Sequence, residues 1–144
     1  MKERILNNLG LMRRANAIAI GETNTGAAVR ADKARLLGLA SDASENARRR
    51  AEGFVYGRNT LMLTLPFTKE EIAAHVGVHG CSMIAITDLG FANALMKLLA
   101  AQWPEEYGLL AEELARRFDR AAERKAETAA HKRNKRNGKR RTNA

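Results

Sequence analysis

The sequence predicts an α/β protein, a three-layer α/β/α sandwich around a four-stranded sheet, followed by a C-terminal helix and a basic tail. Two observations support this fold class. Four short apolar runs alternate with helical patterns along the first hundred residues, as strands and helices alternate in such sandwiches. The 144 residues suffice for one domain, and a hydrophobic fraction of 45% can fill its core.

The first half of the chain contains two helix–strand units. Residues 2–15 are expected to form a helix because Ile5, Leu9 and Met12 recur at helical spacing. The apolar run 17–20 stops at Gly21 and predicts a buried strand. Residues 22–31 then read as a second helix, and the apolar run 36–40 as a second strand.

Capping signals mark the helices that follow. Residues 41–45 are rich in capping side chains and open a polar helix that we expect to end at Gly53. Residues 61–65 form the third strand. Thr68 and Glu71 have the spacing of a capping box, and the helix that they open is expected to end near Gly77. After a fourth strand at 83–86, Asp88 is positioned to cap another helix.

The sandwich is expected to occupy residues 1–102. Trp103 and Pro104 form a natural break, since proline fits the first turn of a helix. An amphipathic helix is predicted over residues 103–130, with an apolar stripe that includes Tyr107, Leu114 and Phe118. Residues 131–144 offer no large apolar side chain to offset the entropy of ordering, so we expect a tail that is disordered until a partner binds.

The net charge of +9 comes from the C-terminal end. Residues 116–144 hold 12 Lys/Arg and 3 Asp/Glu, whereas residues 1–115 hold 13 of each sign. Such a segment attracts polyanions by releasing their counterions, with RNA expected first, DNA next, and a solubilising role as the plain alternative. We expect it to add non-specific affinity through seven residues: Lys132, Arg133, Lys135, Arg136, Lys139, Arg140 and Arg141.

Several other classes of function are excluded or disfavoured. No run of about 18 uncharged apolar residues is present, so a transmembrane helix is not expected. The single cysteine, Cys81, fits a reducing cytoplasm. Gly21 and Gly26 have the spacing of a phosphate-binding loop, but alanine follows where that motif needs lysine. His75, His79 and Cys81 lack a fourth ligand for zinc, so we expect no metal site. Since none of these motifs is complete, we also expect no cofactor and no enzyme activity.

Two loops have the chemistry to bind a ligand. The first, Gly21, Glu22, Thr23 and Asn24, lies between a strand and a helix, where free backbone amides favour a phosphate and polar side chains can bond to bases or sugars. The second comprises Gly77, Val78, His79, Gly80, Cys81 and Ser82, and its small residues let the backbone approach a nucleic acid closely. Each also fits an ordinary connection between elements.

Four collinear stretches within residues 3–99 resemble one family, the bacterial relatives of the archaeal ribosomal protein L-seven-Ae, in the kink-turn RNA-binding superfamily. They are residues 5–15, residues 17–22, residues 39–46, and the set 68–71, 84–88 and 90–92. The resemblance implies an α/β/α sandwich that binds kinked or internally looped RNA through the two loops described above.

The resemblance also assigns roles to single positions. Archaeal members place Asn-Glu after the glycine to read bases, and a lysine about three residues later for phosphate. Here these positions are Thr23, Asn24 and Ala27, so the lysine is missing. We expect Arg30 and Lys33 on the same helix, or the basic tail, to supply the charge.

We therefore expect a monomeric, cytoplasmic, non-catalytic binder of structured RNA, ribosomal or otherwise linked to translation. Gly21, Thr23 and Asn24 would contact a bent backbone, and residues 77–82 would close over a flipped base. Two alternatives stay open: a protein-interaction adaptor, which the neutral globular part and Ala27 would suit, and the RNA-recognition part of an RNA-modifying enzyme.

Overall fold

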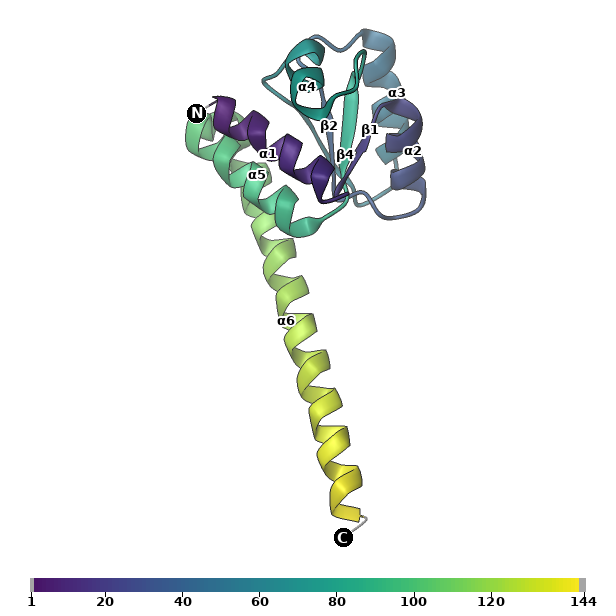
Figure 1. The fold of residues 1–144 in the computed structure, drawn as a ribbon, viewed down its shortest axis with the longest axis vertical. Coiled ribbons are helices and arrows are strands. Elements are labelled where there is room, and N and C mark those ends of the chain that lie inside the picture. Colours follow the sequence, from purple (N-terminus) through teal and green to yellow (C-terminus); the bar gives the residue numbers. More distant parts are fainter. Residues whose placement is uncertain (1, 143–144) are drawn as a thin grey trace.

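The computed structural model describes the backbone of residues 2–142 and the side chains of residues 2–136. Helices and strands alternate along it in the predicted order (Figure 1). The elements are α1 (Lys2–Arg14), β1 (Ile18–Ile20), α2 (Glu22–Arg30), β2 (Leu36–Leu39), α3 (Glu45–Val55), β3 (Leu61–Thr64), α4 (Lys69–Val76), β4 (Met83–Ile86), α5 (Leu89–Gln102) and α6 (Pro104–Thr142).

The four strands form one mixed sheet in the order β1-β4-β2-β3. Strand β4 is antiparallel to both of its neighbours, and β2 is parallel to β3. Strands β1, β2 and β3 therefore run in the same direction. We call the side where these three strands end and β4 begins the carboxyl edge, and the opposite side the amino edge.

Helices cover both faces of the sheet, which confirms the three-layer sandwich. Helices α1, α4 and α5 pack on one face around a core that includes Leu9, Phe67 and Leu95, all fully buried (Figure 1). Helices α2 and α3 cover the other face, where Val29 and Ala51 are fully buried.

The local capping signals are found as predicted. Thr68 and Glu71 form the complete capping box, and Gly77 ends α4 in the left-handed conformation at φ 77°. Asp88 accepts a hydrogen bond from the amide of Phe91 at the start of α5. The predicted end of α3 at Gly53 was wrong. The helix continues to Val55, since glycine tolerates helical torsions, and the chain turns with a positive φ of 70° at Gly57.

Helix α6 begins within one residue of its predicted start, at Pro104, but differs from its prediction in its packing and its end. Tyr107 and Leu114 belong to the main core, so the packed unit does not stop at residue 102. The helix also continues to Thr142, beyond the expected end at residue 130, whereas the expected disorder of the tail before a partner binds stays a prediction. Lysine and arginine have high helix propensities, and they make up 7 of the 12 residues from 131 to 142. Beyond the sandwich, α6 projects as a single rod (Figure 1).

Residues 2–142 contain no helix that combines the length and the apolarity needed to cross a bilayer. Helix α6 has the length, at 39 residues, but it is rich in charged side chains.

Candidate functional site

The two predicted loops meet at the carboxyl edge of the sheet. Strand β1 pairs with β4 so that Ile20 lies opposite Ile84, and the amide of Gly21 donates to the carbonyl of Met83 at 3.0 Å. The first loop therefore begins where the second loop, residues 77–82, ends. Residues far apart in the sequence are brought together by this single strand pairing.

A groove of about 540 Å³, here called the loop groove, opens beside these loops. Asn24 of the first loop and Val78 of the second both line it. Its remaining lining residues are Arg13, Asn16 and the three residues of β1. Strand β1 is an edge strand of the sheet, so one of its sides is open to this groove.

Arg13 is the cationic side chain of the loop groove, and the sequence analysis did not single it out. Its Nη1 lies 3.0 Å from the position that a Cβ on Gly77 would take, so the guanidinium rests on the glycine at the end of α4. No ion pair joins it to a carboxylate within residues 2–136. The available signal was its place in the last turn of the first helix, directly before β1.

The side chains of the first loop point in different directions. Asn24 donates from Nδ2 to the carbonyl of Ile20 at 3.0 Å, which leaves its side-chain oxygen as an acceptor at the groove. Thr23 is exposed. Glu22 forms an ion pair with Arg50 of α3 at 2.9 Å, so this predicted site residue is held toward the neighbouring helix.

The backbone at this edge is open to a ligand. Gly21 precedes α2 at φ 89° and supplies no side-chain cap, so the amides of the first turn of α2 keep the partial positive charge of a helix start. Gly80 has a φ of 75°, and a Cβ there would meet nothing within 4 Å. The site therefore combines free amides with glycines that allow close approach.

The second loop is mostly exposed, with one exception. Val78, His79 and Gly80 face solvent, and Ser82 is half-buried. Cys81, by contrast, is 3% exposed, and its Sγ donates to the carbonyl of Met83 at 3.0 Å. Burial raises the pKa of this thiol. The side chain of Cys81 therefore fills the core, and a ligand contact at this position stays a prediction for its backbone alone.

Arg30 and Lys33 do not reach the loop groove. Both lie toward the amino edge, Arg30 in the last turn of α2 and Lys33 in the turn that precedes β2. The Arg30 guanidinium also lies over the ring of Phe54, 5.9 Å from its centroid. The structure therefore places the cation that serves this groove on α1 rather than on α2.

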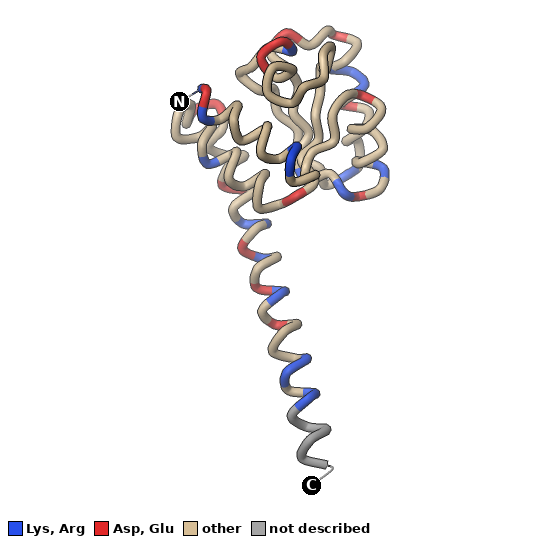
Figure 2. The backbone as a smooth tube through the Cα atoms, viewed as in Figure 1, with Lys and Arg blue, Asp and Glu red and all other residues tan. Residues whose placement is uncertain are grey.

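The basic tail also lies away from the loop groove. Tyr107 of α6 contacts β3 at the carboxyl edge, whereas Arg117 contacts Asn59 before β3, so α6 leaves the sandwich at the amino edge. Lys132, Arg133, Lys135 and Arg136 are exposed on its far part (Figure 2). The structure describes side chains only up to residue 136, so the remaining predicted tail residues, Lys139, Arg140 and Arg141, lie outside that range.

The histidines near these loops do not gather around a common point. His75 lies between Glu3, 3.2 Å from its Nε2, and the carbonyl of Glu71, 3.1 Å from its Nδ1. Within the described part of the chain, no group of three or more His, Cys, Asp or Glu side chains is arranged to hold a metal ion.

Comparison with known proteins identifies the fold alone. The sequence matches no family model and no curated protein. Among solved structures, it is similar to a protein of unknown function from Bacillus halodurans, with a TM-score of 0.60 and 24% sequence identity. The match covers 65% of this chain and 94% of that one.

Proposed function

We propose that this protein binds structured RNA through the loop groove and acts without catalysis. One observation carries the proposal: Asn24, Val78 and Arg13 come from three separate segments and line one open groove that runs along β1 to the carboxyl edge. A polar side chain, an apolar side chain and a cation are thus presented together.

Each part of the groove fits a different group of a bent polynucleotide. The free amides of α2 and the guanidinium of Arg13 suit phosphate oxygens. The hydroxyl of Thr23 and the side-chain oxygen of Asn24 suit base or sugar edges. Val78, which is 37% exposed, offers an apolar contact to an unstacked base. The described lining of the groove holds no carboxylate, histidine or thiol, so we assign it to binding.

The class of RNA is proposed from the resemblance to the kink-turn RNA-binding superfamily. That resemblance favours a kinked or internally looped RNA linked to translation, and a cytoplasmic location. The family's phosphate-binding lysine corresponds to Ala27, which is exposed on α2. Arg13, reaching the same edge from α1, replaces that charge in our proposal.

A comparison of adjacent arginines tests the proposal. Arg13 and Arg14 are both exposed at the end of α1, but only Arg13 lines the loop groove. The probe is an RNA duplex interrupted by an internal loop, with the fully paired duplex as reference. We expect Arg13→Ala to weaken binding of the looped duplex about tenfold and to lower its salt slope by roughly 0.9, as for one lost phosphate contact. Arg14→Ala should stay within about twofold of the unchanged protein.

Equal effects of the two substitutions would remove Arg13 from the site. Equal affinity for looped and paired duplexes would contradict recognition of structured RNA. Partners that survive ribonuclease treatment in a pull-down would favour the protein-adaptor alternative instead.

A further inference from the structure

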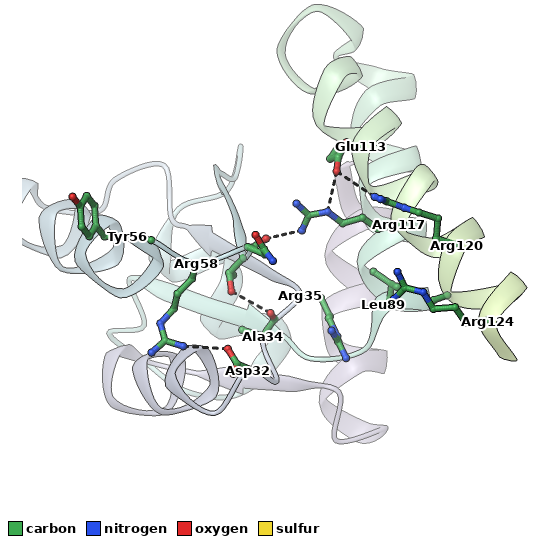
Figure 3. Close-up of a pocket in the computed structure, with 14 residues that line it drawn as sticks. Asp32, Ala34, Arg35, Tyr56, Arg58, Leu89, Glu113, Arg117, Arg120 and Arg124 are labelled. Atoms are coloured by element: carbon green, nitrogen blue, oxygen red, sulfur yellow. Dashed lines mark hydrogen bonds and ion pairs between the residues drawn. The ribbon is translucent and has the colours of Figure 1, made fainter. Parts of the chain in front are cut away.

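A second, larger cavity lies at the amino edge, where the sequence analysis placed no site. It has a volume of about 1180 Å³ and opens between α6 and the turns that precede β2 and β3 (Figure 3). We call it the arginine cavity, because five arginines line it: Arg35, Arg58, Arg117, Arg120 and Arg124. Among its lining residues, the carboxylates are Asp32 and Glu113.

These two carboxylates do not balance the arginines. Glu113 is shared, with oxygens 2.7 Å from Arg116, 3.0 Å from Arg117 and 3.8 Å from Arg120. Asp32 forms an ion pair with Arg58 at 3.1 Å. The lining residues alone thus carry three more positive than negative charges.

Arg35 and Arg124 account for two of the three excess positive charges. Neither Arg35 nor Arg124 has a hydrogen bond or ion pair through its guanidinium within residues 2–136. In Figure 3 the two lie on opposite sides of the cavity, Arg35 on the turn before β2 and Arg124 on α6. A phosphate chain that entered the cavity would meet donors from both walls.

An exposed aromatic side chain lies at the far end of the same cavity. Tyr56, directly after α3, is 87% exposed and lines the cavity at the end away from α6 (Figure 3). Arginines that hold phosphates, together with an aromatic ring on which a base stacks, are the elements by which proteins bind single-stranded nucleic acid. A cavity of this volume also exceeds the range typical for small ligands.

We propose that the arginine cavity is a second RNA site, which binds a single-stranded segment with phosphates on Arg35 and Arg124 and a base on Tyr56. RNA as the ligand rests on the proposed function, but the surface is separate. The two sites share no lining residue, and β4 lies between β1, which lines the loop groove, and β2, whose preceding turn lines the arginine cavity, so roughly 10 Å of sheet (two strand spacings) separates them. A structured RNA bound at one edge thus has a site at the other for an unpaired flank.

A charge-matched pair of double variants of the full chain tests the proposal, with a labelled 12-nucleotide oligouridine as probe. Arg35→Ala with Arg124→Ala removes the two unpaired cations. Arg49→Ala with Lys97→Ala removes two exposed cations elsewhere, on α3 and α5. We expect the cavity variant to bind oligouridine at least tenfold more weakly, with a salt slope lower by about 1.4, as for two lost phosphate contacts on a single strand. The control variant should change affinity less than twofold.

The stacking part of the proposal has its own pair of variants. Tyr56→Leu should weaken oligouridine binding about fivefold, whereas Tyr56→Phe, which keeps the ring, should bind as the unchanged protein does. Equal loss in both would overturn the assignment of a base to this ring. Equal displacement of oligouridine by a polyglutamate of matched charge would overturn the assignment to nucleic acid.

The two proposals fail in distinguishable ways. If the cavity variant and its control bind oligouridine equally, while Arg13→Ala still weakens the looped duplex, the second site is refuted and the loop groove stands. If the cavity variant loses oligouridine while Arg13→Ala has no effect, the arginine cavity stands and the loop groove is refuted. A protein that binds neither probe refutes both.

Discussion

Substitution of Leu114 tests whether α6 is part of the folded domain. Leu114 is fully buried and belongs to the core cluster on the face covered by α1, α4 and α5. Leu109, five residues earlier on the same helix, is 84% exposed. The same change, leucine to alanine, is therefore available at a buried and at an exposed position of one element.

The expected magnitude follows from burial. Leu114→Ala removes three buried carbon groups, worth about 2.4 kcal/mol in transfer free energy at roughly 0.8 kcal/mol per group. Incomplete collapse of the resulting cavity raises the expected loss of unfolding free energy to about 3 kcal/mol. For a chain of this size that corresponds to a fall in Tm of roughly 12 °C. Leu109→Ala should change the stability by less than about 0.5 kcal/mol.

Urea denaturation followed by circular dichroism measures both variants against the unchanged protein. Any change in helix propensity is common to the two and cancels in the comparison. Equal unfolding free energies for Leu114→Ala and Leu109→Ala would refute the packing of α6 into the core. The sandwich would then end near residue 102, as the sequence analysis expected.

Three further results are expected. Tyr107→Phe should cost about 1 kcal/mol in urea denaturation, because the hydroxyl donates to the carbonyl of Thr64 at 2.8 Å; no loss would contradict that bond. Lys2 holds the pKa of Glu71 below its ordinary value, so the stability that this carboxylate adds is complete above the ordinary pKa and is lost as pH falls through the lowered one. The stability difference between the unchanged protein and Glu71→Gln should therefore shrink on acidification, and a constant difference would refute the linkage. Cys81 is buried with a raised pKa, so Ellman's reagent should react with it slowly in the native protein and fast in urea; equal rates would contradict its burial.

The parts of the fold that depend on local chemistry could be predicted from the sequence. The capping box of Thr68 and Glu71 involves residues three positions apart, so its spacing alone identifies it. The four apolar runs likewise mark the strands: β2 and β4, in the middle of the sheet, are fully buried, whereas β1, predicted as buried, and β3 are edge strands and mostly half-buried. The positions of the two loops of the candidate site could also be predicted, because each loop joins a helix and a strand whose ends were located from the sequence.

The parts that depend on tertiary packing could not be predicted. Arg13 is near Gly77 only because α1 packs beside α4, and no pattern near either residue indicates that contact. Arg30 was expected at the RNA site because it lies on α2, the helix that follows the first loop. The direction of α2, however, places Arg30 toward the amino edge. The packing of Leu114 against the sandwich depends on the path of α6, which an amphipathic stripe alone does not specify.

RNA binding at the carboxyl edge of the sheet is tested most directly by backbone amide chemical shifts. The duplex with an internal loop is titrated into isotopically labelled protein, and the shift changes are mapped onto the fold. We expect the largest changes at Gly21 to Asn24 and at Gly77 to Ser82, with the side chain of Arg13 among the affected groups. Changes confined to α3 or to the outer part of α6, with both loops unmoved, would contradict the account.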